Sequence, residues 1–261
     1  MTNEPSQTDS GFPSKTPVPE LSISEYEVLK TEWLSILDMQ DANFQEKVLG
    51  IFLHTREWMS ARSEKRSPCV VAQTVANLRG SPPAGDAMKA RLVRAIFIAS
   101  LETPRQIPKP GVIGMVTAIF RLAFGWGNFH VPSLGREIVA GSVADIPFSF
   151  DDGELRGCCE EFLRDRLSNA EWFIRNGCVR GTGALVVACG LLTWYARGAA
   201  FINGKNVVGI EQARCARAIV DGFFQESPPP FEKVMHEGYF SIFFDALLGR
   251  ETLVSSLSRI L

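Results

Sequence analysis

From Ser22 onward, the apolar positions of this chain recur with the spacing of an α-helix. Ser22 and Glu25 have the spacing of a capping box, in which each residue supports the free backbone groups at a helix start. Strand-like alternation is almost absent, and no repeat of fixed period is found. We therefore expect an all-α fold, an irregular bundle of about eight to nine helices. The first helix has its apolar side chains on one face, at Tyr26, Leu29, Trp33 and Ile36.

The same pattern predicts how the rest of the chain is divided. Residues 1–21 are rich in Pro, Ser and Thr and lack apolar periodicity, so they are expected to form a disordered tail. Residues 22–261 are expected to form a single all-helical domain, with a subdivision at the connector 104–110 as the alternative. Further helices are predicted from Asn43, over 71–80, from Asp86 to just before Pro104, and over 112–124, 151–174, 178–201, 208–224 and 231–261.

Two of these stretches are apolar on more than one side. Residues 112–124 are apolar nearly all round, which predicts a central helix. The longest uncharged apolar run lies between Arg180 and Arg197. It is shorter than the ~18 to 20 residues of a membrane span, and its Gly and Cys residues suit a buried core helix. We therefore expect no membrane span.

The longest irregular stretch inside the folded part is the Gly-rich segment 125–150, GWGNFHVPSLGREIVAGSVADIPFSF. Long internal loops are uncommon in compact domains unless they cover or form a site. Aromatic side chains offer a large contact area at modest entropic cost. We therefore predict that this loop binds a ligand or partner through Trp126, Phe129 and His130.

Composition narrows the compartment and the class of partner. The formal net charge of −2 argues against a broad nucleic-acid surface, which needs clustered excess Lys and Arg. The six cysteines include no CxxC pair, and the N-terminus lacks the basic start and apolar run of a secretory signal. These features favour a reduced, cytoplasmic protein.

The acidic stretch DDGELRGCCEEFLRDRL, residues 151–167, is the strongest candidate for chemistry. Asp151 and Glu154 have capping-box spacing, so a helix start explains these acids without a ligand. Cys158 and Cys159 would point about 100° apart on a helix and would not readily hold one metal ion, so we expect one buried and one partly buried thiol. The three histidines have no partner at helical spacing. We expect no catalytic residue, no metal and no cofactor.

The longest motif runs from Phe162 to Phe201, FLRDRLSNAEWFIRNGCVRGTGALVVACGLLTWYARGAAF, followed by NGKNVVGIEQARCARAIVDGFF. It resembles the C-terminal helical region of the flagellin lysine N-methylase family. The resemblance implies a protein-modifying enzyme with an N-terminal cysteine cluster suited to an iron–sulfur or metal centre. That cluster is missing here, so the family's chemistry and catalytic residues do not carry over to positions of this chain.

Three functions are therefore considered. The first is a non-catalytic, cytoplasmic binding or accessory protein, which acts on another protein or takes a small molecule into a pocket. The second is a lysine N-methylase-like enzyme or a degenerate relative of one. The third is a secreted bacterial effector that uses its N-terminal tail for export.

Overall fold

The structure is a computed structural model that describes residues 21–80, 86–227, 229–236 and 251–258. The predicted tail lies outside these residues, except for Leu21, which is buried. The described part is all-α apart from one two-stranded hairpin, as the sequence predicts. Twelve α-helices occur in it, more than the eight to nine expected.

The helices of the N-terminal half are α1 (Ile23–Leu37), α2 (Phe44–Glu64), α3 (Val71–Gly80), α4 (Ala87–Glu102), the 3-10 turn η1 (Thr103–Arg105) and α5 (Val112–Phe124). The predicted caps start α1 and α2, where Ser22 and Asn43 form capping boxes with Glu25 and Glu46, and Asp86 caps α4. The hairpin follows, with β1 (Asn128–Val131), η2 (Pro132–Leu134) and β2 (Arg136–Val139). The remaining helices are α6 (Ala140–Asp145), α7 (Gly153–Leu167), α8 (Ala170–Asn176), α9 (Cys178–Ile202), α10 (Ile210–Gln225), α11 (Pro230–His236) and α13 (Glu251–Ser258).

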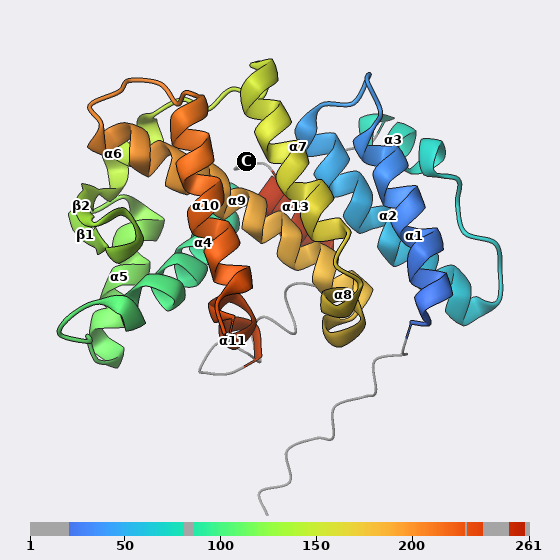
Figure 1. Ribbon diagram of the computed structural model, residues 1–261, viewed down its shortest axis with the longest axis horizontal. Coiled ribbons are helices and arrows are strands. Elements are labelled where there is room, and N and C mark those ends of the chain that lie inside the picture. The colour runs from blue at the N-terminus through green and yellow to red at the C-terminus, as the bar shows by residue number, and fades with distance from the viewer. Residues whose placement is uncertain (1–20, 81–85, 228, 237–250, 259–261) are drawn as a thin grey trace, which may run out of the picture.

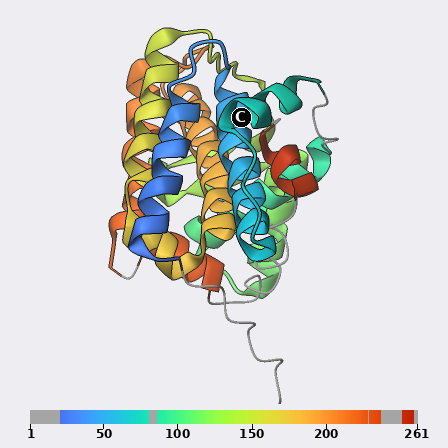
Figure 2. The ribbon, with the colours of Figure 1, turned by 90° about the vertical axis from the view of Figure 1, so that its right-hand side faces the viewer.

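The fold is built around α9, which contains the predicted core helix. Of its 25 residues, 20 are buried. It packs against α2, α10, α13, α6, α8 and α7, and Figure 2 shows it (light orange) beside α2 (light blue). Within the described residues it is the one helix long and apolar enough to cross a membrane, but 83% of its apolar window is buried in the fold. That burial is consistent with the core helix of a soluble protein.

The prediction that residues 112–124 form a central helix is wrong. The helix exists as α5, but only Ala118, Ile119 and Ala123 are buried in it. It lies at one end of the molecule against α4 and α6 (Figure 1). Apolar residues on all sides of a helix do not ensure burial on all sides: Ile119, Met115 and Leu122 pack toward the core, whereas Val112, Ile113, Val116, Phe120 and Phe124 are exposed.

The segment 125–150 is also more ordered than predicted. β1 and β2 form an antiparallel hairpin, with Phe129 paired to Ile138 and His130 paired to Glu137. Gly135 ends the turn with a positive φ of 65°, a conformation that glycine adopts without strain. Four-residue strands are too short to show a clear alternation of apolar and polar positions, which explains why the hairpin escaped the sequence reading.

The predicted helix over 151–174 is two helices. Asp152, rather than Asp151, is the N-cap of α7 and accepts hydrogen bonds from the backbone N–H groups of Glu154 and Leu155. The chain breaks after Leu167, and Asn169 caps α8 by accepting from the backbone N–H of Trp172. The added helices α6 and α8 account for much of the difference in helix number.

A close approach of α8 to α9 requires a glycine at one position. A Cβ atom on Gly181 would lie 2.8 Å from Cδ1 of Phe173 and 3.0 Å from Cζ3 of Trp172, both buried aromatic residues. A methyl group there has to displace rings that are held in the core.

We therefore expect Gly181→Ala to lower the free energy of unfolding by about 1 to 3 kcal/mol. Gly157→Ala in α7 is the matched control, because a Cβ there meets nothing within 4 Å, and it should raise stability by about 0.5 to 1 kcal/mol. Urea unfolding followed by circular dichroism measures both. Equal effects of the two substitutions would contradict the packing described here.

Candidate functional site

The outer side of α5 carries a row of exposed apolar side chains. We define the α5 face as six residues with exposed fractions between 41% and 84%: Val112, Ile113, Val116, Phe120, Phe124 and, directly after the helix, Trp126. Together they expose on the order of 600 Å², since a large aromatic side chain alone spans about 150 to 250 Å². That area is at the upper end of the largest apolar patch on a typical monomer.

Three aromatic rings of the α5 face are stacked in a row. The ring centroids of Phe120 and Phe124 are 5.8 Å apart, and those of Phe124 and Trp126 are 5.2 Å apart, with interplanar angles of 12° and 28°. Offset-stacked pairs of this kind add to the stability of an aromatic cluster. The rings therefore support one another in an exposed position and form a stiff ridge.

The position of Trp126 follows from how α5 ends. Gly125 takes the left-handed conformation, with φ of 73°. The backbone N–H of Trp126 donates a hydrogen bond to the carbonyl oxygen of Arg121, at 2.9 Å. A Cβ on Gly125 would lie 3.1 Å from Cα of Gly141, so α6 closely approaches this turn. The Arg121 guanidinium also donates to the carbonyl of Asn128, at 3.1 Å, which ties the helix to β1.

The structure separates the three residues that the sequence singled out. Trp126 is 67% exposed and belongs to the α5 face. Phe129 is 4% exposed and lies in the core, so it does not offer the contact surface we assigned to it. His130 is exposed on the hairpin across from Glu137, and its backbone carbonyl accepts from the Gln106 amide at 2.9 Å. That Trp126 and His130 bind a ligand stays a prediction.

The sequence reasoning missed the larger part of the α5 face. Phe120, Phe124 and the aliphatic residues before them were assigned to the core because the whole helix is apolar. Their spacing carries no signal that separates them from the core side, because Ile119 is buried and Met115 and Leu122 also pack against the core. Only the packing of α5 shows which of its large apolar residues are covered.

A buried junction holds the hairpin and the end of α4 in place. The Tyr195 hydroxyl donates to Oε1 of Glu102 at 2.5 Å, and the backbone N–H of Ser133 donates to Oε2 of Glu102 at 3.1 Å. Tyr195 and Glu102 are fully buried, and burial together with the charge of Glu102 raises the pKa of Tyr195 well above its ordinary value. The tyrosine therefore stays a donor, and the three groups connect α9, α4 and the hairpin turn.

Arg105 extends this junction to the surface. Its guanidinium donates to Oγ of Ser133 at 3.1 Å, forms an ion pair with Glu226 at 2.7 Å, and lies 4.8 Å from the ring centroid of Phe223. The end of α4 is thereby attached to the end of α10. Since α5 follows directly after this segment, the junction helps to fix where α5 lies.

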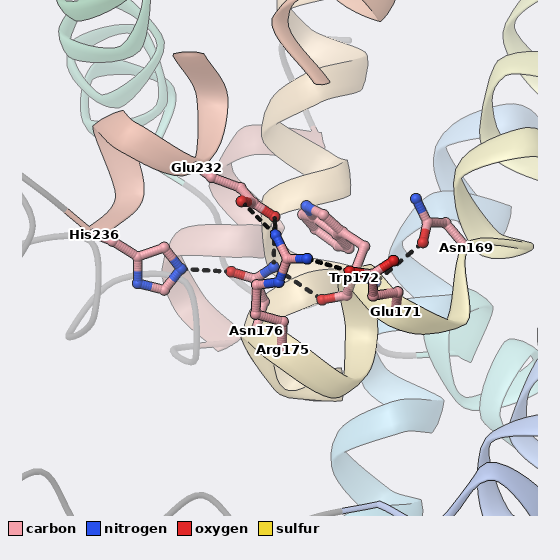
Figure 3. A network of polar contacts seen from close by, with 7 residues as sticks. All are labelled: Asn169, Glu171, Trp172, Arg175, Asn176, Glu232 and His236. Carbon is pink, nitrogen blue, oxygen red and sulfur yellow. Dashed lines mark hydrogen bonds and ion pairs between the residues drawn. The ribbon is translucent and has the colours of Figure 1, made fainter. Parts of the chain in front are cut away.

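A second polar cluster connects α8 to α11 (Figure 3). Asn176 is buried, and its amide group donates to the carbonyl of Trp172 at 2.8 Å while its Oδ1 lies 2.6 Å from Nε2 of His236. Arg175 pairs with Glu232 at 3.0 Å and also with Glu171. Because these contacts run between the two helices and use both ends of the Asn176 amide, we interpret the cluster as a structural connection.

The buried thiols do not form a reactive or metal-binding group. Cys158 and Cys159 are both buried, so the expectation of one partly buried thiol is wrong. Burial raises the pKa of the Cys158 thiol and raises that of Cys178 to about 12, so both stay protonated near neutral pH. Among the described residues, no group of three or more His, Cys, Asp or Glu side chains is arranged to hold a metal ion.

The buried junction gives a testable difference between two tyrosines. Tyr195 and Tyr26 are both fully buried, but the Tyr26 hydroxyl donates to the backbone carbonyl of Leu167, at 2.7 Å, rather than to a carboxylate. Hydrogen bonds to charged groups contribute more than neutral ones. We expect Tyr195→Phe to lower the free energy of unfolding by about 2 to 3 kcal/mol and Tyr26→Phe by about 1 kcal/mol. Urea denaturation measures the free energy of unfolding of both variants. Equal losses would show that the hydrogen bond to Glu102 stabilises the fold no more than the bond to a neutral backbone carbonyl.

Comparisons with known proteins give no relative for this chain. No protein-family model matches it, and neither a search of curated proteins nor a search of solved structures found a similar one. The geometry of the α5 face and of the clusters around it is therefore the basis for the functional argument.

Proposed function

We propose that this protein is a non-catalytic binding or accessory protein that docks another protein on the α5 face. The observation that carries the proposal is the exposed row of stacked rings, Phe120, Phe124 and Trp126, which continues the exposed Val112, Ile113 and Val116 of the same helix. Soluble monomers rarely leave a contiguous apolar patch of this size open, and such patches mark interaction sites.

The shape of the α5 face suits a helix from the partner. Val112, Val116, Phe120 and Phe124 follow one another at intervals of four residues and so form a single ridge along α5. Ridges of this kind pack into the grooves between the side chains of a second helix. The aromatic half supplies the rigid anchors that dominate binding energies in protein interfaces.

The support beneath the α5 face is consistent with docking by rigid bodies. The buried Glu102–Tyr195 junction and the close approach of Gly125 to Gly141 fix the two ends of the α5 region. A surface that is ordered before binding loses little conformational entropy when its partner arrives. The protein then acts as a rigid surface to which the partner's helix binds.

A cytoplasmic location is part of this proposal. All six cysteines are free thiols, which favours a reducing compartment. Four of them are buried and one is half-buried, so they behave as small apolar core residues.

Site-specific photo-crosslinking in cells that express the protein tests the proposal. A photo-reactive phenylalanine derivative replaces Val116 on the α5 face, which is 41% exposed, or Val28 on α1, which is 54% exposed and serves as the matched control. We expect one discrete protein adduct from position 116 and none from position 28. The yield of the adduct should fall when Ile113→Ser is added, because that change removes an exposed apolar contact, and the adduct should disappear when Phe124→Ser is added as well.

Adducts of equal yield at both positions would contradict the proposal, because they would show non-specific contact. The same holds for a position-116 adduct that survives Ile113→Ser together with Phe124→Ser. Ile23→Ser on α1 is the matched substitution, since Ile23 is 70% exposed and Ile113 is 84% exposed. It should leave the adduct unchanged.

A further inference from the structure

The stretch of sequence that contains α5, residues 103–136, carries no acidic residue. Between Glu102 and Glu137 there are four basic residues, Arg105, Lys109, Arg121 and Arg136, and no Asp or Glu. Arg105 is paired with Glu226. Lys109, Arg121 and Arg136 are exposed, and none of them forms an ion pair with an acidic residue in the described part of the chain. The α5 face therefore has unneutralised positive charge at its border.

Among the described residues, the elements that pack most closely on α5 do not supply the missing acids. Helix α4 carries Lys89, Arg91 and Arg94, and its last residue, Glu102, is buried against Tyr195. Helix α6 has one acidic residue, Asp145, at the end remote from the Gly125–Gly141 contact. Strand β1 has none. The positive border is thus a property of the local structure as well as of the sequence.

We infer that the partner segment on the α5 face is an acidic amphipathic helix. The inference rests on the proposed function and adds the chemical class of the partner. An apolar stripe on the partner packs against the ridge of α5, and carboxylates on either side of that stripe face Lys109 and Arg121.

The spacing of the two cations defines what the partner must present. Arg121 lies nine residues into α5, about 14 Å along the helix axis from Val112, and Lys109 precedes the helix at the opposite end. A partner helix with acidic residues near both ends of an apolar stripe of about three turns meets both cations. On a helical wheel Arg121 lies beside Thr117, at one edge of the α5 face. An ion pair between Arg121 and the partner would therefore form at the rim of the interface, and the apolar centre would exclude water.

The distribution of charge favours a protein helix over an anionic lipid surface. The whole chain has a net charge of −2, and residues 103–136 contribute +4, so the remaining chain carries −6. A lipid surface would meet the repulsion of that acidic remainder, and stable electrostatic attachment to lipid usually needs a cluster of four to eight basic residues. A single helix contacts only the positive region.

Two synthetic helical peptides of about 18 residues test the inference on the full-length protein. Both carry the same Leu and Ile stripe, and one has Glu and the other Lys on its flanks. Fluorescence anisotropy of the labelled peptides measures the dissociation constants. At low ionic strength we expect the acidic peptide to bind on the order of tenfold more tightly, and we expect the ratio to approach one at about 0.5 M salt.

Variants of the charged residues test whether Lys109 and Arg121 cause the preference for the acidic peptide. The double variant Lys109→Glu, Arg121→Glu should reverse the preference between the peptides. Arg214→Glu is the matched control, because Arg214 is exposed on α10, which does not pack on α5, and it should leave the tenfold ratio unchanged. Ile113→Ser should weaken both peptides without changing their ratio, since it removes apolar contact alone.

The outcomes separate this inference from the proposed function. If both peptides bind equally and Ile113→Ser weakens both, the acidic partner is wrong and docking on the α5 face stands. If neither peptide binds, the helical partner is overturned. Binding of phosphatidylserine vesicles that Ile113→Ser abolishes, without binding of either peptide, would assign the face to lipid and overturn the inference. A concentration-dependent dimer of the free protein that Ile113→Ser dissolves would assign it to a second copy of the chain.

Discussion

The burial of α9 is the constraint on which the rest of the structure depends. A 25-residue helix with 20 buried residues needs neighbours on nearly all sides, and α2, α6, α7, α8, α10 and α13 provide them. Where a neighbour comes closest, small residues such as Gly181 make room for aromatic rings. The helices around α9 occupy the space next to it, so α5 packs on α4 and α6 at one end of the molecule (Figure 1). Its outward side chains are exposed for this reason.

A buried polar junction fixes that outlying part to the centre. Glu102 receives hydrogen bonds from Tyr195 of α9 and from the hairpin backbone at Ser133, so one carboxylate joins three elements that are distant in sequence. A buried polar group is stabilising only when its partners are all in place, and the same requirement makes it specific for one arrangement. The apolar core sets which helices lie together, and this junction sets where the hairpin and the start of the α5 region are placed. Docking on the α5 face then needs little rearrangement.

The sequence predicts the helical class, the first four helix starts and the buried nature of the 180–197 run, because capping residues and amphipathic spacing are local signals. It fails at α5 and at the hairpin. For α5, periodicity shows which residues are apolar but not whether another helix covers them. That depends on which helices pack around α9. For the hairpin, four-residue strands carry too little alternation. Trp126 is exposed on the surface that we propose for binding, whereas Phe129, three residues later, faces the core on β1. The acid-free run 103–136 is visible in the sequence, but its meaning depends on knowing that Lys109 and Arg121 border an exposed face.

An open apolar face with positive charge at its border connects the fold to the proposed role, and its exposure in the free protein can be measured directly. Hydroxyl-radical footprinting of the full-length protein compares the oxidation rates of Phe120 and Phe124, 52% and 41% exposed, with those of the fully buried Phe97 and Phe223. We expect fast oxidation at Phe120 and Phe124 and almost none at the two core phenylalanines. Rates at Phe120 and Phe124 as low as those of the core would show that the α5 face is covered in the free protein, and would contradict the account.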